Sequence, residues 1–356
     1  MKILLTGACG FVGSTVARAL IEDVSGIAIV GFDNLVRAGS ERNRGALLSL
    51  GVDLRHGDVR VRSDFDQLPA VDWVIDAAAN PSVLAGVDGA TSSRQLVEHN
   101  LYGTVNLLEF CKTHKAGFIL LSTSRVYSIA DLASLPVEAH GCAVRLPSHA
   151  QLPAGVSAHG ISEQFSTTPP LSLYGSAKLA SEVLALEYAD AFGFTSWINR
   201  CGVLAGAGQF GRRDQGIFTY WINAWLRRRP LTYVGFDGTG SQVRDCLHPR
   251  DLVPLLIQQM TKPAGDRPRL VNLGGGLPQS MSLAQLSAWC EDRLGHHVVS
   301  SNPQTRKFDV PWLIMDASLA GATWGWKPIT ALDAILEEIA GHAELNPEWL
   351  DISGQA

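Results

Sequence analysis

MKILLTGACGFVGS, residues 1–14, is the stretch of sequence that decides the fold. Its apolar run, ILL, is typical of a buried parallel strand. A turn with Gly7, Gly10 and Gly13 follows, and the apolar periodicity from Val16 to Ile21 predicts a helix. Glycines at this spacing let the backbone turn tightly and approach a phosphate group at the helix N-terminus. The stretch therefore predicts a phosphate-binding strand–turn–helix unit.

An acidic residue lies in register with this unit. The apolar run from Ile27 to Phe32 ends in Asp33, which lies 20 positions beyond Gly13. A carboxylate there can accept hydrogen bonds from both hydroxyls of an adenosine ribose, and it would repel a 2′-phosphate. We therefore expect the cofactor NAD and not NADP. Glycines alone would also fit a plain left-handed turn, but the strand, the helix and the acid together favour the cofactor site.

The composition excludes several classes of function. The chain has 356 residues, 46% of them hydrophobic and 18% charged, with a net charge of −5, so we expect neither nucleic acid nor an anionic membrane as a partner. No apolar run reaches the roughly 18 residues of a membrane span. The six cysteines form no C-x-x-C pair, so we expect buried thiols in a reducing compartment and no metal site. These features predict a cytoplasmic protein.

The order of predicted elements indicates the architecture. Short apolar strands alternate with helical segments through the first half, which predicts an α/β fold with a Rossmann-type doubly wound parallel sheet. We expect residues 1–200 to form this domain, residues 245–275 to return to it, and residues 201–356 to form mainly a smaller C-terminal α/β lobe that binds substrate. Four tryptophans are expected to pack inside that lobe, namely Trp312, Trp324, Trp326 and Trp349. The segment 130–170, rich in Pro, Ser, Gly and His, is expected to form a long loop over the active site.

Residues at the ends of the predicted strands are candidates for contacts with the cofactor. The strand from residue 52 ends in Asp58, which either reaches an adenine edge or merely forms a turn. Cys201 follows another strand, and it either faces the cofactor or is a packing thiol. The residues expected to bind the cofactor are Gly7, Cys9, Gly10, Phe11, Val12, Gly13, Asp33, Asn34, Asp58, Val59, Ala77, Ala78, Ala79, Asn100, Ser122, Tyr174, Lys178 and Cys201.

Tyr174 and Lys178 form a Y-x-x-x-K pair in a segment with helical periodicity. Four residues of helix place both side chains on one face. A phenol is a poor base, with a pKa of about 10, and a nearby cation favours its phenolate form. The strand from residue 117 ends in Ser122-Thr123-Ser124, whose hydroxyls could hold a substrate oxygen against Tyr174. Alone, the pair would be typical of any exposed amphipathic helix.

Together these motifs resemble the extended short-chain dehydrogenase/reductases. The resemblance rests on TGACGFVGS, the helix with Asn100, Gly103 and Thr104, the hydroxyl cluster before Val126-Tyr127, and Y-x-x-x-K. It implies an enzyme that acts on a nucleotide sugar with tightly held NAD. It also implies that Tyr174 transfers the proton, that Lys178 positions Tyr174 and contacts the nicotinamide ribose, and that Thr123 holds the substrate.

The residue that follows Thr123-Ser124 narrows the chemistry. Sugar-nucleotide dehydratases of this superfamily have an Asp-Glu pair directly after the hydroxyl, and decarboxylases of uronic acids have a Glu before Val-Tyr. This chain has Ser124-Arg125 there. Because arginine stays protonated at neutral pH, it cannot act as the general acid of an elimination. The remaining reaction is oxidation and re-reduction of one carbinol, which is epimerisation.

Further segments are similar to the CDP-paratose 2-epimerases, also called CDP-tyvelose epimerases. They include STSRVY from Ser122, SLYGSAKLASE from Ser172, NRCGVLAG from Asn199 and QVRDCLH from Gln242. The resemblance implies inversion of C2 of a CDP-3,6-dideoxyhexose through a transient 2-keto sugar. A UDP-hexose 4-epimerase would need the same residues, and a non-catalytic NAD-sensing or scaffolding protein is a third reading.

Arg244 is the candidate for binding the substrate diphosphate, because a guanidinium can hold two phosphate oxygens at once. The alternative for Arg244 is an ion pair with its neighbour Asp245. The residues expected to bind substrate are Asn80, Thr123, Ser124, Arg125, Gln209, Asp214, Gln215 and Arg244. The family resemblance also implies a homodimer that pairs the helices near residues 92–114 and 174–192.

Overall fold

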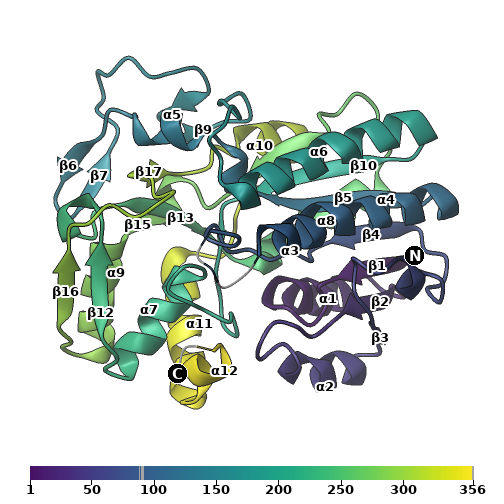
Figure 1. Ribbon diagram of the computed structural model, residues 1–356, viewed down its shortest axis with the longest axis horizontal. Helices are drawn as coiled ribbons and strands as arrows, with labels where there is room; N and C mark the ends of the chain where they lie inside the picture. The colour runs from purple at the N-terminus through teal and green to yellow at the C-terminus, as the bar shows by residue number, and fades with distance from the viewer. Residues whose placement is uncertain (88, 90–91, 355–356) are drawn as a thin grey trace.

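Among residues 1–87, 89 and 92–354, which the computed structural model describes, seven parallel strands form one central sheet in the order β14-β10-β5-β4-β1-β2-β3. The strands are β1 (Lys2–Thr6), β2 (Ala28–Asp33), β3 (Asp53–His56), β4 (Trp73–Asp76), β5 (Gly117–Thr123), β10 (Ser196–Cys201) and β14 (Leu270–Leu273). Figure 1 shows this sheet on the right of the molecule. The predicted Rossmann-type sheet is confirmed.

Helices cover both faces of this sheet. They are α1 (Phe11–Asp23), α2 (Arg42–Ser49), α4 (Gly103–His114), α6 (Leu173–Phe192), α8 (Val253–Thr261) and α10 (Ser318–Trp324). Leu5 of β1 packs on the side of α1, α2, α8 and α10, whereas its neighbour Leu4 packs on the side of α4 and α6. Successive residues are therefore both buried, so the strand reads as a continuous apolar run. Within the described part of the chain, no helix has both the length and the apolar character that a membrane crossing requires.

The order of the strands leaves a crevice between β1 and β4. The chain proceeds outward from β1 to β2 and β3 and then crosses back to β4, which pairs with β1 in parallel register from Ile3 opposite Trp73 to Thr6 opposite Asp76. In open parallel sheets, ligands bind outside the carboxyl ends of the strands where the order reverses. The glycine turn after β1 lies at this position.

A second lobe occupies the left of Figure 1. One sheet contains β11 (Val203–Leu204), β13 (Val243–Leu247), β15 (Ser280–Ser282) and β17 (Trp312–Leu313), and β12 (Leu231–Val234) pairs with β16 (Val299–Asn302). Its helices are α7 (Ile217–Leu226), α9 (Leu283–Leu294), α11 (Leu332–Leu345) and α12 (Trp349–Ile352). Short helical turns of this lobe are η4 (Phe236–Gly238) and η6 (Leu277–Gln279), whereas η5 (Pro249–Leu252) packs against α1 and α8 beside the central sheet. The aromatic face of α7 packs between α9 and α11, which holds the lobe together.

Two of the four C-terminal tryptophans do not pack where the sequence suggested. Trp324 and Trp326 belong to the core of the central sheet, and the ring of Trp324 meets that of Trp197 edge-on at 5.1 Å between centroids. The prediction that they pack within the C-terminal lobe is wrong. The reason is that α10 returns to the central sheet beside β14, and the apolar tryptophans at its end find their partners there.

The segment 130–170 is ordered and does not cover the cavity described below. It follows η3 (Ser124–Val126) and contains α5 (Ile129–Ala133), the hairpin β6 (Glu138–His140) and β7 (Ala143–Arg145), and the hairpin β8 (Val156–Ser157) and β9 (Gly160–Ile161). Its apolar side chains, such as Leu132 and Phe165, form a core with Val243 and Trp312. No residue of this segment lines the cavity. The expected loop over the active site is therefore wrong, because those apolar side chains bury themselves against the second lobe.

Candidate active site

A cavity of about 450 Å³ opens at the carboxyl ends of β1, β2, β4 and β5 and extends to the second lobe. Predicted cofactor residues that line it are Gly7, Gly10, Phe11, Val12, Gly13, Asp33, Asn34, Val59, Ala77, Ala78, Ala79, Ser122, Tyr174 and Cys201. Predicted substrate residues that line it are Thr123, Ser124, Arg125, Gln209, Asp214, Gln215 and Arg244. Five further predicted residues do not line it: Cys9, Asp58, Asn80, Asn100 and Lys178.

The glycine turn allows a very close approach between β1 and α1. Gly7 has a φ of +61°, and a Cβ on Gly13 would lie 2.1 Å from the Gly7 carbonyl oxygen. Gly10 caps α1 without any side-chain hydrogen bond, and residues of the first turn of this helix line the cavity. A helix N-terminus of this kind favours an anionic group such as a pyrophosphate.

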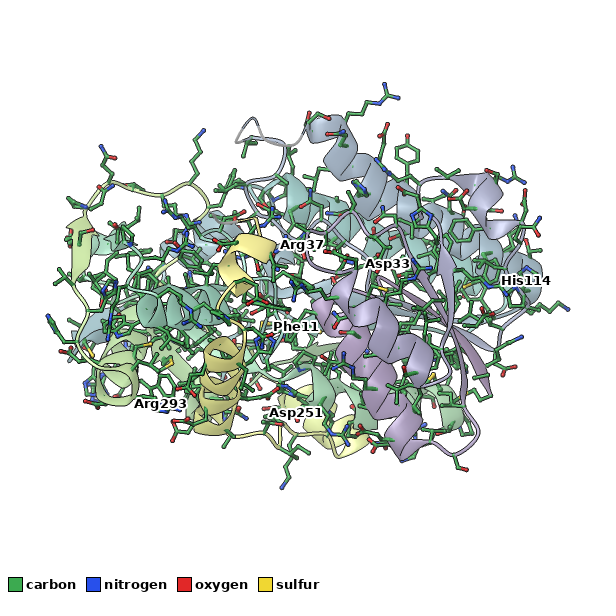
Figure 2. All side chains as sticks on the ribbon, turned by 90° about the horizontal axis from the view of Figure 1, so that it is seen from below. Phe11, Asp33, Arg37, His114, Asp251 and Arg293 are labelled. Carbon is green, nitrogen blue, oxygen red and sulfur yellow. The ribbon has the colours of Figure 1, made fainter. Side chains whose placement is uncertain are left out.

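Asp33 is fixed at the end of β2. Its carboxylate accepts hydrogen bonds from the backbone N–H groups of Cys9, at 2.8 Å, and Leu35, at 2.7 Å. Burial raises the pKa of Asp33, and these backbone N–H groups oppose that rise. Figure 2 shows Phe11, Asp33 and Arg37 in the middle of the molecule, near the C-terminal segment. Cys9 therefore acts through its backbone, as a support for Asp33.

Asp58 is held by neighbouring side chains. Its two oxygens accept from the Arg60 guanidinium, at 2.9 and 2.6 Å, and from the Asn34 amide, at 3.0 Å. Burial would raise the pKa of Asp58, but the hydrogen bonds from Arg60 and Asn34 hold it well below its ordinary range. Asp58 thus shapes the turn after β3, whereas its neighbour Val59 lines the cavity.

Asn100 fixes the loop that follows β4. It lies in η2 (Glu98–Tyr102), a π-helical turn between α3 (Ser93–Val97) and α4. Its side-chain amide exchanges two hydrogen bonds with the backbone of Asn80, at 2.8 and 2.9 Å. Asn100 therefore positions the Ala77–Ala79 wall of the cavity without lining the cavity itself.

Tyr174 and Thr123 meet at the inner end of the cavity. Tyr174 lies in the first turn of α6, which Ser172 caps, and its hydroxyl is hydrogen-bonded to the side chain of Thr123. Burial raises the pKa of Tyr174, whereas the hydrogen bond with Thr123 and the nearby Arg125 charge lower it. Cys201 also lies here, and burial raises the pKa of its thiol to about 12, so it remains protonated near neutral pH. The tyrosine and threonine hydroxyls are thus placed together, as their order in the sequence suggested.

Lys178 is buried one helical turn beyond Tyr174. Burial lowers its pKa, while the carboxylates of Asp76 and Glu182 raise it. Glu182 in turn forms a buried ion pair with Arg200 at 2.6 Å and accepts a hydrogen bond from the Ser122 hydroxyl at 2.5 Å. Lys178, Asp76, Glu182 and Arg200 therefore form a buried cluster of opposite charges close to Tyr174.

The part of the cavity that is expected to bind substrate contains several cations. Arg244 pairs with Asp309 at 2.8 Å and donates to the carbonyl of Val310. Its sequence neighbour Asp245 instead accepts a backbone N–H from Gly276. The expected alternative, an ion pair between Arg244 and Asp245, is therefore replaced by one with Asp309. Whether Arg244 also binds a diphosphate stays a prediction.

Three predicted substrate residues contact other parts of the chain. The Asp214 carboxylate accepts from the Ser82 hydroxyl at 2.5 Å, and the Gln215 amide oxygen accepts from Arg37 at 2.8 Å. Gln209 donates to the Leu204 carbonyl at 2.8 Å. Through these contacts the loop 205–216 of the second lobe closes over the cofactor side of the cavity.

Several lining residues were missed from the sequence. They are Arg37, His99, Arg213, Gln242, Met281, Leu286, Arg306, Lys307, Phe308 and Asp309. Only their types hinted at a role: Arg306 and Lys307 are two cations in one short run that ends in the acid Asp309. The folding of residues 304–310 against β13 brings that run to the cavity, and no local pattern predicts such a contact.

The residues at the crevice fit a dinucleotide. The left-handed Gly7 and the tight packing at Gly13 leave a cradle that side chains would fill, and the bare N-terminus of α1 suits a pyrophosphate. The Asp33 carboxylate, at the end of the neighbouring strand, suits the ribose hydroxyls. These three features lie together at the carboxyl ends of β1 and β2.

Comparisons with known proteins agree with this geometry. Residues 3–274 match the NAD dependent epimerase/dehydratase family. The CDP-paratose 2-epimerase of Salmonella typhi is 28% identical, over 94% of this chain and 97% of the relative, and the UDP-glucose 4-epimerase of Corynebacterium glutamicum is 26% identical, over 95% and 94%. The solved structure of the UDP-glucuronic acid 4-epimerase from Bacillus cereus, in complex with UDP-glucuronic acid and NAD, has a TM-score of 0.77 and 25% identity, over 97% and 99% of the two chains.

Proposed function

The chain belongs to the NAD dependent epimerase/dehydratase family, and we propose that it is a nucleotide-sugar epimerase that inverts one carbinol carbon without net oxidation or reduction. The carbon is C2 of a CDP-3,6-dideoxyhexose, so that CDP-paratose is converted to CDP-tyvelose. Similarity to the CDP-paratose 2-epimerase of Salmonella typhi along nearly the whole of both chains supports this choice.

One observation carries the choice of epimerisation over elimination. The charged group beside Tyr174 and Thr123 is the guanidinium of Arg125. An elimination needs a carboxyl group there to protonate the leaving hydroxyl, and a guanidinium keeps its proton. Among the described residues, the site therefore offers Tyr174 as a proton acceptor for a carbinol, and the charged side chain beside Tyr174 is a cation and not a carboxylic acid.

The residues divide the work as follows. Bound NAD supplies a reversible hydride acceptor and donor. Thr123 holds the carbinol oxygen by a hydrogen bond, and Tyr174 takes the hydroxyl proton as the carbinol is oxidised to a ketone. Tyr174 returns that proton when the opposite face of the ketone is reduced. Lys178 favours the phenolate form of Tyr174. The arginines of the substrate side hold the diphosphate.

A UDP-hexose 4-epimerase is the second candidate. Similarity to the Bacillus cereus enzyme solved with UDP-glucuronic acid favours it. The two activities share Tyr174, Lys178 and Thr123 and differ only in which carbinol faces the nicotinamide. Discrimination between such sugars depends on a few contacts of about 1–3 kcal/mol each.

Native mass spectrometry followed by a panel of nucleotide sugars tests the proposal. The purified protein is expected to carry NAD, and nuclear magnetic resonance should show inversion at C2 of a CDP-3,6-dideoxyhexose. Inversion at C4 of a UDP-hexose would contradict the proposed substrate but keep the epimerase. Bound NAD with no turnover of any sugar would contradict the enzyme itself and favour a sensor.

A further inference from the structure

Arg125 is held against the helix that carries Tyr174. Its backbone N–H donates to the Thr123 hydroxyl at 3.2 Å, which forms the turn η3. A Cβ on Gly175, the residue after Tyr174, would lie 2.2 Å from the Arg125 carbonyl oxygen. The close approach of these backbones fixes Arg125, Thr123 and Tyr174 relative to one another at the inner end of the cavity.

The Arg125 guanidinium lacks a carboxylate of its own. It donates to the carbonyl of Phe308 at 3.3 Å, and within the described part of the chain it forms no ion pair. The Asp309 carboxylate attracts the Arg125 guanidinium but is paired with Arg244. The charge of Arg244 repels that of Arg125. Burial and this repulsion lower the pKa of Arg125 to about 10. A buried charge without a partner is costly, so an anion is expected beside it during the reaction.

We propose that Arg125 acts through Tyr174, as a positioning residue whose positive charge stabilises the phenolate that accepts the substrate's hydroxyl proton. In that step the O–H bond of the carbinol breaks, the O–H bond of the tyrosine forms, and the charge of Arg125 is unchanged. The inference rests on the proposed function only in taking Tyr174 as the proton acceptor. It goes beyond that function because it assigns to Arg125 part of the work that is expected of Lys178.

The groups that face the Tyr174 hydroxyl come from three elements. Burial raises the pKa of Tyr174 most, Thr123 at the end of β5 and Arg125 in η3 lower it, and the Cys201 thiol at the end of β10 raises it. Lys178, in α6, interacts with Asp76, Glu182 and Cys201. Two carboxylates attract Lys178, whereas the carboxylate that attracts Arg125, that of Asp309, is paired with Arg244.

The test is an ultraviolet titration of tyrosinate in the NAD-loaded protein, with Tyr174→Phe subtracted to isolate Tyr174. We expect Arg125→Gln to raise the pKa of Tyr174 by about one unit, a tenfold loss of phenolate at a given pH. Arg125→Lys, which keeps the charge, should restore most of the shift. Arg306 lines the same cavity but is not among the groups that shift the pKa of Tyr174. Arg306→Gln should therefore leave the pKa of Tyr174 unchanged.

An unchanged Tyr174 pKa in Arg125→Gln would overturn the inference. If Arg125→Gln does not fold, Arg125→Met, whose apolar chain suits the buried position, gives the same comparison. An unchanged pKa with a raised KM confined to sugars that carry a carboxylate would overturn it too, and would assign Arg125 to substrate recognition. Because the titration needs no substrate, a shifted pKa without turnover would overturn the proposed function and leave this inference standing.

Discussion

Tyr174 and Thr123 are the residues on which the proposed chemistry depends most directly. The phenol is buried, which by itself disfavours its ionised form, and the compensating groups are the Thr123 hydroxyl and the Arg125 charge. A tyrosine in such a place is useful as a base only where a neighbouring cation, here Arg125, favours its phenolate form. Ionisation of Tyr174 therefore costs free energy, and its protonated form is the favoured one.

Removing the Tyr174 hydroxyl should abolish most of the activity. We predict that Tyr174→Phe lowers kcat by roughly 10²- to 10⁴-fold, the usual contribution of a positioned acid–base group, while NAD remains bound. The matched control is Tyr188→Phe on the same helix, whose hydroxyl bonds the exposed Glu109 at 2.9 Å and which should keep full activity. Turnover followed by magnetic resonance decides between them, and a Tyr174→Phe variant with more than a tenth of wild-type activity would refute the assignment.

The Asp58–Arg60 pair should make a pH-dependent contribution to stability. The pKa of Asp58 is lowered in the folded protein, so its stabilisation is present above the ordinary carboxyl pKa of about 4 and is lost as the pH falls below it. Arg60→Gln should therefore lower the free energy of unfolding by about 0.5–1 kcal/mol at pH 7, and the two proteins should converge towards pH 2. Urea titrations at both pH values measure this.

Arg55→Gln is the control for that experiment, because Arg55 pairs with Asp53 on the exposed side of β3. It should leave the unfolding free energy unchanged at both pH values. An Arg60→Gln difference that persists undiminished at low pH would contradict the linkage and indicate a packing effect.

At this scale the sequence predicted residues whose role depends on local spacing. Gly7, Gly13 and Asp33 are set by the first strand–turn–helix unit, and Tyr174 and Thr123 follow from a helix and a strand end. The pairing of Arg244 with Asp309 was not predicted, because only the fold brings these two residues together. Side chains that meet across loops leave no periodic signal in the sequence.

Among the elements, the contact between β1 and α1 is the most demanding. Gly13→Ala would place a Cβ 2.1 Å from the carbonyl oxygen of Gly7, so the helix must move away from the turn. We predict a loss of about 1–3 kcal/mol in unfolding free energy and weaker NAD binding. Gly45→Ala in α2, where a Cβ meets nothing within 4 Å, should instead stabilise by about 0.5–1 kcal/mol.

Urea unfolding and titration with NAD distinguish these outcomes. The comparison is informative because both changes add one methyl group to a helical glycine of the same domain. Equal stabilities for the two variants, with equal NAD affinities, would contradict the account of the glycine turn.

Elements with a strong periodic or apolar pattern were predictable, and β1, β2, β3 and β5 of the central sheet follow the sequence closely. The segment 130–170 was not, since its short hairpins and α5 are stabilised by contacts with Val243 and Trp312 far along the chain. Likewise α10 places Trp324 in the core of the central sheet, and the sequence of α10 alone does not predict this position. Tertiary packing, and not local propensity, decides these elements.

Across the whole molecule, the cofactor side and the second lobe are tied together at Arg37. Its guanidinium donates to the Phe210 carbonyl and to Gln215, and burial lowers its pKa to about 10. We predict that Arg37→Met releases NAD roughly tenfold faster, because hydrogen bonds to a charged group contribute about 1.5–3 kcal/mol. Gel filtration of the loaded protein, with retained NAD measured by absorbance, tests this.

Arg42→Met provides the comparison for Arg37. Arg42 also joins the two parts of the molecule, through an exposed ion pair with Glu348 at 3.2 Å, but it does not line the cavity. It should retain NAD as the wild type does. If Arg37→Met also retains NAD undiminished, the loop 205–216 does not control the escape of the cofactor.

The outer face of α4 and α6 is the surface that we predict to pair in a homodimer. Val183 and Phe192 of α6 expose 54% and 46% of their surfaces, and Tyr102, which directly precedes α4, exposes 59%. Light scattering should give twice the chain mass of 38.2 kDa, and Val183→Glu should lower it towards the monomer. Ile329→Glu, which alters an apolar residue exposed outside α4 and α6, should not. A monomeric wild type would contradict the prediction.

The most direct test of the central claim is turnover of a CDP-3,6-dideoxyhexose in heavy water, followed by magnetic resonance. Oxidation and re-reduction within one site predicts inversion at C2 with the original hydrogen still on the carbon, and no NADH released. Solvent deuterium at the inverted carbon would contradict the account, because it would mean that the carbon had lost a proton and not a hydride.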